Sequence, residues 1–255
     1  MTTSKERFWE IDLLRGVAVI MMVTYHALYD LDYFGICHVQ VHSGFWSVFA
    51  RVTAIIFLIL VGVSLHLSHT RKMRTGASPK FSKYLWRGLF IFSCGLVVTL
   101  ITWIFMGRGF VVFGVLHLIG IAIILAYPFL RFRFLNLFFG GIAIFLGILL
   151  RDQTFDFPWL LWLGFIPRGF YSVDYFPVFP WFGAILVGIF FGRIFYPNFS
   201  RVFSVQNLPD GSFGKLLCFL GKNSLRIYLI HQPILIAVIY LLRFSEIPMG
   251  QILQI

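Results

Sequence analysis

The sequence predicts an all-α membrane protein: a helix bundle with about seven transmembrane helices and an outer half-helix that is re-entrant or interfacial. Of its 255 residues, 59% are hydrophobic and only 12% are charged. Soluble globular chains carry about 25% charged residues, so this composition indicates that most of the chain lies in lipid. The second observation is a series of apolar runs long enough to span a bilayer. These runs cover residues 12–34, 46–67, 85–106, 111–130, 134–150, 177–196 and 223–242.

The positions of the basic residues orient the bundle. With the N-terminus inside, sixteen of the 21 Lys and Arg residues lie in cytoplasmic segments. The other five, at or near the outer ends, are Arg51, Arg108, Arg151, Arg168 and Arg243. Because the reverse orientation inverts this bias, the positive-inside rule predicts an N-in, C-out topology. Topology thus accounts for much of the net charge of +11, and no nucleic-acid partner is expected.

Residues 1–255 read as a single transmembrane domain without an obvious repeat. Between 151 and 176, the apolar core 159–166 would span only about 12 Å as a helix, which is too short to cross. This segment, centred on 155–168, is therefore the predicted outer half-helix. Residues 197–215 read as a polar cytoplasmic loop. The first apolar run is too long and too charged for a cleaved signal peptide, so it is predicted to be retained.

The first apolar run contains ionisable residues that a simple anchor would not tolerate. Asp12 and Arg15 lie near its start, His26 past its middle, and Asp30 and Asp32 at its far end. At 100° per residue, Arg15 and His26 point within about 20° of each other and lie roughly 16 Å apart along the helix. Asp12 and Asp30 fall within about 40° of His26. Charged groups in hydrocarbon usually face a bundle interior or a wet cavity, so this stripe predicts one wall of a site.

The chain has seven histidines, the side chain best suited to move protons near neutral pH. His26 lies in the first helix, and His38 and His42 lie in the outer loop that follows. For the remaining four, a neutral imidazole bonded to a neighbouring helix or a solvated side chain is the simpler interpretation; they are His66, His69, His117 and His231. The three isolated cysteines show neither metal-ligand spacing nor a disulfide framework, and no metal is predicted. They are Cys37, Cys94 and Cys218.

Several sequence blocks carry a family resemblance. They are EIDLLRGVAVIMMVTYHALYDLDYFG, RVTAIIFLILVGVSL, FGVLHLIGIA, DYFPVFPWFGAILVG and LGKNSLRIYLIHQP. In this order they resemble the small prokaryotic members of the heparan-α-glucosaminide N-acetyltransferase catalytic family, over essentially the whole chain. The wider group of transmembrane acyltransferases is marked by an Arg and a His with ten residues between them in an early helix, as Arg15 and His26 are. In the glucosaminide acetyltransferases the catalytic His lies instead in the outer loop, at His42 or one residue before it when counted back from Gly62. The resemblance leaves both histidines as candidates.

The resemblance implies an acyltransferase in the cytoplasmic membrane of a prokaryote. It would take acetyl from cytoplasmic acetyl-CoA and pass it to an extracytoplasmic saccharide or amine, with membrane lipid around it. His26 or His42 would act as general base or acyl carrier. Asp30 could fix the tautomer of the catalytic imidazole, and Arg51 could stabilise the thioester oxyanion or pair with Asp30, Asp32 or Asp174. Dimers occur among the relatives, so a homodimer is compatible with the resemblance.

Four basic residues near the inner helix ends are candidates for holding the phosphates of coenzyme A, because their apolar stems can stay in lipid while their heads meet phosphate. They are Arg15, Arg87, Lys222 and Arg226. Contact with anionic lipid is the alternative for such residues. Two other functions compete with the enzyme as a whole. A transporter or channel-like protein would use the intramembrane charges as an ion or proton path, although no repeat of the transporter kind is visible. A non-catalytic membrane partner with an acyltransferase fold is the third reading.

Overall fold

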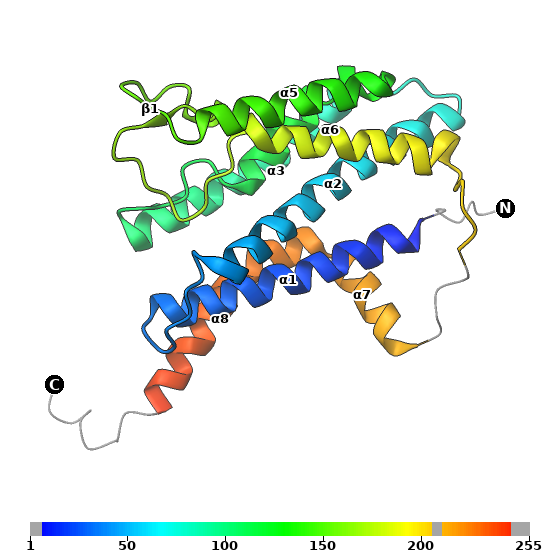
Figure 1. Ribbon diagram of the computed structural model, residues 1–255. Coiled ribbons are helices and arrows are strands. Elements are labelled where there is room, and N and C mark those ends of the chain that lie inside the picture. Colours follow the sequence, from blue (N-terminus) through cyan, green and yellow to red (C-terminus); the bar gives the residue numbers. More distant parts are fainter. Residues whose placement is uncertain (1–6, 206–210, 246–255) are drawn as a thin grey trace, which may run out of the picture. The chain divides into compact units, whose positions relative to one another are not determined.

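The computed structural model describes residues 7–205 and 211–245. Over these residues it is all-α apart from one pair of two-residue strands, which confirms the predicted fold class. The helices are shown in Figure 1. They are α1 (Trp9–Tyr33), α2 (Gly44–Arg74), α3 (Phe81–Met106), α4 (Val115–Leu125), α5 (Phe134–Leu150), α6 (Val178–Phe195), α7 (Ser212–Lys222) and α8 (Ser224–Ser245).

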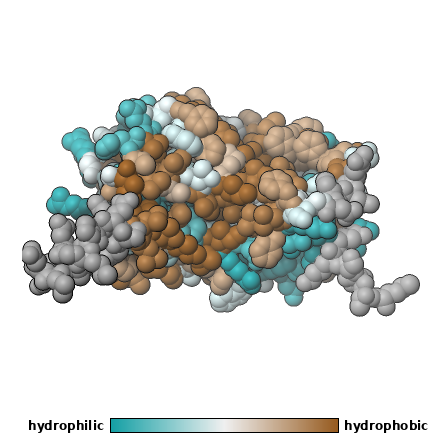
Figure 2. Space-filling model, turned by 90° about the horizontal axis from the view of Figure 1, so that it is seen from below, coloured by the Kyte–Doolittle hydropathy of each residue, from teal (hydrophilic) through white to brown (hydrophobic). Residues whose placement is uncertain are grey.

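Five of the described helices are long and apolar enough to cross a membrane: α1, α2, α3, α6 and α8. Two shorter apolar helices, α4 and α5, occupy two further predicted runs. At 11 residues, α4 rises roughly 16 Å, about half of a hydrocarbon core. Apolar side chains cover most of the face seen in Figure 2. The protein is therefore an integral membrane protein, whereas the number of crossings and the N-in orientation stay predictions.

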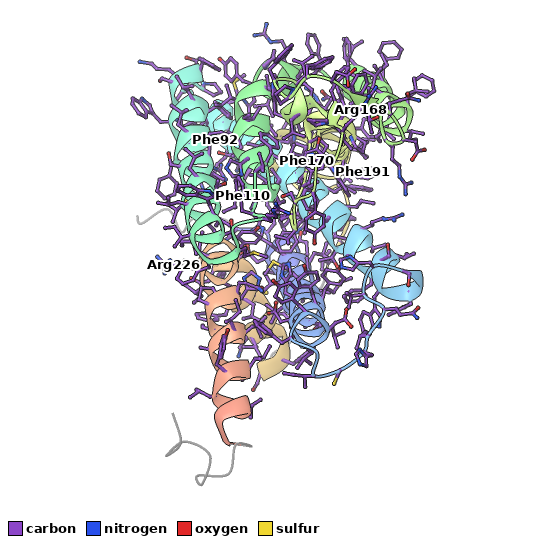
Figure 3. The ribbon with its side chains drawn as sticks, turned by 90° about the vertical axis from the view of Figure 1, so that its left-hand side faces the viewer. Phe92, Phe110, Arg168, Phe170, Phe191 and Arg226 are labelled. Carbon is purple, nitrogen blue, oxygen red and sulfur yellow. The ribbon has the colours of Figure 1, made fainter. Side chains whose placement is uncertain are left out.

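The predicted run 111–130 is helical over a shorter stretch than its composition suggests. The backbone before α4 is extended: Phe113 pairs with Tyr175, and Phe176 N–H donates to the Phe113 carbonyl at 2.8 Å. A hydrogen bond joins the loop of Phe110 to the loop of Phe170: the Ser172 hydroxyl donates to the Phe110 carbonyl at 2.9 Å. Figure 3 labels both phenylalanines. Proline 128 begins a 3₁₀ turn, Pro128–Arg131, that closes the segment.

The predicted outer half-helix at 155–168 is wrong. In its place β1 (Thr154–Phe155) pairs in parallel with β2 (Ile166–Pro167), and a single 3₁₀ turn, Leu161–Leu163, lies between them. Pro158 and Gly164 explain the difference, because Pro cannot continue a helix and Gly164 has a φ of 122°. Fewer than two helical turns remain between these two residues.

The chain divides into two compact units, and the prediction of a single domain stays a prediction. The first unit contains α1, the beginning of α2, α7 and α8. Helix α7 was not predicted, since residues 197–215 read as a loop. It packs on α1 with almost no space between the backbones: Gly16 of α1 faces the Leu217 carbonyl, and Gly221 of α7 faces the Asp12 carbonyl. A side chain at either glycine would overlap the other helix.

The second unit contains the rest of α2 and helices α3 to α6. Small residues again allow close packing, as is usual where helices associate in lipid. A Cβ on Gly88 of α3 would lie 2.6 Å from the carbonyl of Gly120 in α4, and a Cβ on Gly183 of α6 would lie 2.6 Å from the carbonyl of Gly140 in α5. The helix pairs α3–α4 and α5–α6 are therefore held by backbone proximity as well as by side-chain contact.

Candidate active site

A pair of histidines joins α1 to α8 inside the first unit. Nε2 of His231 lies 2.8 Å from Nδ1 of His26, and the ring centroids are 4.8 Å apart. His231 is only 7% exposed. The two residues are 205 positions apart in the chain, so the packing of α8 on α1 creates the contact. We refer to His26 and His231 as the histidine pair.

One turn farther along α1, a second polar contact runs parallel to the first. Nε2 of Gln232 donates to Oδ1 of Asp30 at 2.6 Å. Asp30 is 3% exposed, and its other oxygen, Oδ2, has no hydrogen-bond partner among the described residues. Consecutive residues of α8 thus bind two α1 residues that are four apart, which fixes the register between these helices. A buried carboxylate oxygen that lacks a partner is an acceptor available to a substrate group.

The outer-loop residues are arranged differently. His42 is exposed, and its ring lies edge-on to Tyr29 with centroids 5.6 Å apart. Arg51 is exposed in the third turn of α2 and donates to the Ser47 hydroxyl at 3.1 Å. The described contacts of Arg51 include no ion pair with Asp30 or Asp32, so the expected pairing with those two residues is not found. The structure brings His26 and Asp30 into one contact region with α8 and leaves His42 and Arg51 outside it.

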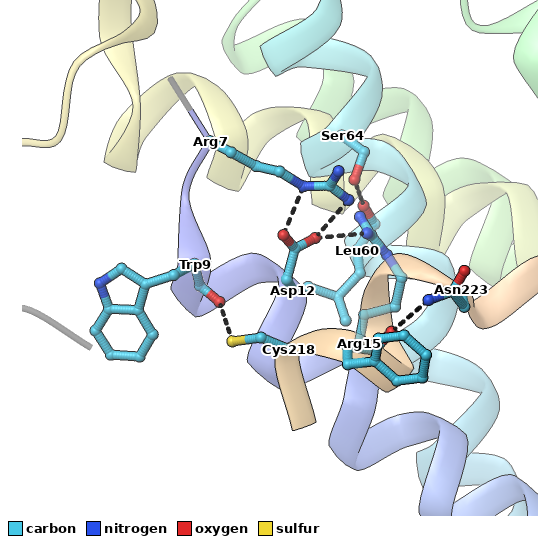
Figure 4. Close-up of polar contacts among 9 residues, drawn as sticks. Arg7, Trp9, Asp12, Arg15, Leu60, Ser64, Cys218 and Asn223 are labelled. Carbon is cyan, nitrogen blue, oxygen red and sulfur yellow. Dashed lines mark hydrogen bonds and ion pairs between the residues drawn. The ribbon is translucent and has the colours of Figure 1, made fainter. Parts of the chain in front are cut away.

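The beginning of α1 carries a separate ionic cluster, drawn in Figure 4. Asp12 is 2% exposed and binds Arg7 through both oxygens, at 2.6 Å from Nε and 3.0 Å from a terminal nitrogen. Arg15 reaches the same carboxylate at 3.2 Å. Two guanidinium groups therefore share one carboxylate. Guanidinium groups are also the side chains best suited to bind a phosphate group.

Helix α7 brings further basic residues to this end of α1. The close approach of Gly221 to α1 fixes the place of Lys222, which is exposed at the end of α7. Arg226 is exposed at the beginning of α8 (Figure 3) and lies 3.5 Å from the Asn223 side-chain oxygen. Cys218, on the buried face of α7, donates to the Trp9 carbonyl at 3.5 Å, and burial raises the pKa of its thiol. Cys218 is thus a packed thiol.

The fourth predicted phosphate ligand, Arg87, lies in the second unit. It is exposed near the beginning of α3, where Lys83 lies close to Arg87, to Arg71 and to Lys72. Four cations therefore gather at the ends of α2 and α3. The structure brings Arg15, Lys222 and Arg226 into one unit and places Arg87 in the other.

The remaining buried histidines have structural roles in the second unit. Nδ1 of His117 accepts from the Gly114 N–H at 3.2 Å and so caps the start of α4. His66 contacts the Tyr196 carbonyl at 3.3 Å through Nε2. For these two the simpler interpretation agrees with their contacts, whereas His231 makes a contact with a second titratable group. The sequence gives His231 the same simple interpretation as these two, and it places Gln232 beside His231 in a polar patch of the last helix without indicating the partner of either.

Comparison with known protein families gives a match. A family model described as "Heparan-alpha-glucosaminide N-acetyltransferase, catalytic" matches residues 7–233, which is most of the chain. No curated protein and no solved structure matches it.

Proposed function

Because the chain belongs to the heparan-α-glucosaminide N-acetyltransferase catalytic family, we propose that it is a membrane-integral acetyltransferase that transfers acetyl from acetyl-CoA to an extracytoplasmic amino sugar or related glycan. The observation that carries the proposal is the histidine pair, His26 with His231 at 2.8 Å, within helices apolar enough to span a membrane. Imidazoles are costly in such helices unless they are partnered, and they are the side chains best able to move a proton there.

The chemistry requires a base on the acceptor side. In the proposed step, the nitrogen or oxygen of the acceptor forms a bond to the acyl carbon of acetyl-CoA. At the same time His26 takes the proton from that nitrogen or oxygen. The oxyanion that develops on the thioester carbonyl needs a donor, and Arg51 stays the predicted candidate. The C–S bond then breaks, and His26 returns the proton to the leaving thiolate. No oxidant, reductant or metal is required for this balance.

We assign His26 and not His42 as the base. His26 lies in a contact region with Asp30, whose Oδ2 is an open acceptor for a donor group of the sugar or amine. His42 is exposed and has only a ring contact with Tyr29. His26 is half-buried and hydrogen-bonded to His231, and such a base keeps its orientation more effectively than an exposed one.

Acetyl-CoA supplies the acetyl group as a thioester and brings several phosphates. The basic residues Arg15, Lys222 and Arg226 of the first unit fit that chemistry, since each is a cation near the end of a helix, and Arg87 of the second unit stays a separate candidate. The N-in topology would put these ends in the cytoplasm, where the donor is found. His26 lies roughly 16 Å farther along α1 than Arg15, toward the outer face.

The test is an acetyl-transfer assay on the purified protein in detergent, with radiolabelled acetyl-CoA and glucosamine, glucosamine oligosaccharides or simple amines as acceptors. The proposal predicts labelled acceptor and stoichiometric release of coenzyme A. If no acceptor is labelled and the protein does not bind coenzyme A, the enzyme reading fails. Ion or proton flux in liposomes that needs no coenzyme A would support a transporter instead.

A further inference from the structure

We infer that His231 is a positioning residue that holds His26 in the tautomer protonated at Nδ1, so that Nε2 of His26 carries the free lone pair. The inference rests on the proposed function for its catalytic consequence. The structural part is independent of it and follows from which atoms can donate in the described contacts.

At the far end of the contact, His231 binds carbonyl oxygens of its own helix. Nδ1 of His231 lies 2.7 Å from the carbonyl oxygen of Tyr228 and 3.2 Å from that of Ile227. A carbonyl oxygen only accepts hydrogen bonds. Nδ1 of His231 therefore carries a proton and donates it to its own helix.

Among the described residues, His231 has no negatively charged partner that would stabilise a positive charge on its ring. Its described partners are two carbonyl oxygens, the Tyr228 ring and the imidazole of His26, and none of them carries a negative charge. The carboxylate of Asp30 is bound to Gln232. An imidazolium that is 7% exposed and has no anionic partner would be costly, so His231 is neutral. Its Nε2 then carries a lone pair and can only accept.

The proton position on His26 follows from that of His231. The 2.8 Å contact between Nε2 of His231 and Nδ1 of His26 needs one proton, and His231 cannot supply it. That proton is on Nδ1 of His26. In a neutral imidazole the other nitrogen is then unprotonated, and no described residue forms a hydrogen bond to Nε2 of His26. The hydrogen-bond order is thus His26 to His231 to the Tyr228 carbonyl.

This order performs the task that an orienting group performs for any histidine base: it selects the tautomer and holds the ring. Without His231, His26 could carry its proton on Nε2, which would turn the base into a donor. In serine proteases, loss of the orienting partner leaves the wrong tautomer and lowers kcat by about four orders of magnitude. We expect a fall in kcat of at least about 100-fold here, within the usual range of general-base contributions.

The test is ¹⁵N NMR of the full chain in lipid with labelled histidine, where protonated and unprotonated ring nitrogens have well-separated shifts. A His26→Gln sample identifies the His26 signals. The wild type should show Nδ1 protonated and Nε2 unprotonated. In His231→Leu the protonated nitrogen should change to Nε2, and kcat should fall about 100-fold or more with KM little changed. His231→Gln, whose side-chain oxygen can still accept from His26, should keep the wild-type tautomer and most of the kcat.

Each outcome decides a different claim. A wild-type His26 protonated at Nε2 overturns the inference, as does a His231→Leu protein that keeps the Nδ1–H tautomer. The wild-type tautomer is measured without any change at His231, so a His231 variant that fails to fold does not decide the matter. A protein with the expected tautomer that transfers no acetyl group overturns the proposed function and leaves the assignment of protons standing.

Discussion

Replacing His26 with glutamine removes the proposed base and little else. The glutamine amide can still donate to Nε2 of His231, so the contact between α1 and α8 can survive. The loss should therefore appear in turnover and not in folding. General bases contribute about 10²–10⁴-fold, which corresponds to about 3–5 kcal/mol of transition-state stabilisation. We expect kcat of His26→Gln to fall by that factor while the midpoint of thermal unfolding changes little.

The matched control is His42→Gln, the same substitution at the competing histidine. His42 is exposed and has only a ring contact with Tyr29, so kcat should change less than about tenfold. Both variants are measured with radiolabelled acetyl-CoA at saturating acceptor, so that kcat and KM are separated. If His42→Gln loses activity and His26→Gln retains it, the reasoning from burial and partners is wrong and the outer loop holds the base.

Two further predictions concern packing and topology. Gly221→Ala should lower the free energy of unfolding by about 1–3 kcal/mol, because the new methyl group overlaps a carbonyl of α1. The control is Gly141→Ala, whose new methyl group meets nothing within 4 Å, and this variant should be neutral or stabilising. Thermal melts measure both. A membrane-impermeant maleimide added to intact cells should label Cys37, which is exposed in the loop after α1. It should leave Cys218 unlabelled until the protein is denatured, because Cys218 is buried and burial raises the pKa of its thiol. Equal destabilisation by the two alanines would contradict the packing argument. Labelling of Cys37 only after the cells are opened would contradict the N-in orientation.

The apolar runs predicted most of the helices, since length and composition alone distinguish a lipid-facing helix from a loop. Helix α7 was not predicted because its sequence, SFGKLLCFLGK, is short and mixes polar with apolar residues. A segment of that kind forms a stable helix only when a neighbouring helix covers one of its faces. The glycine that faces α1 has no signature in the sequence that would separate it from a loop glycine. The prediction of a half-helix at 155–168 was wrong because it rested on the apolar content of the segment, whereas Pro158 and Gly164 both interrupt a helix.

The candidate site could be predicted only along single helices. Helical geometry placed Arg15, His26 and Asp30 on related faces of α1, because spacing within one helix fixes direction. It could not supply His231 or Gln232, which come from the other end of the chain and meet α1 only through packing. For Arg51 the sequence left two alternatives, an oxyanion donor or a pair for Asp30, Asp32 or Asp174, and it did not indicate the Ser47 hydroxyl one turn away. Partners between helices depend on which faces pack together, and one sequence does not give that information.

The most direct test of the account is vectorial transfer. The protein is reconstituted in liposomes that enclose glucosamine, and labelled acetyl-CoA, which does not cross the bilayer, is added outside. We expect labelled N-acetylglucosamine inside the vesicles and coenzyme A released outside, and neither product with His26→Gln. Product that forms only when donor and acceptor are on the same side, or product that forms equally well with His26→Gln, would contradict that expectation.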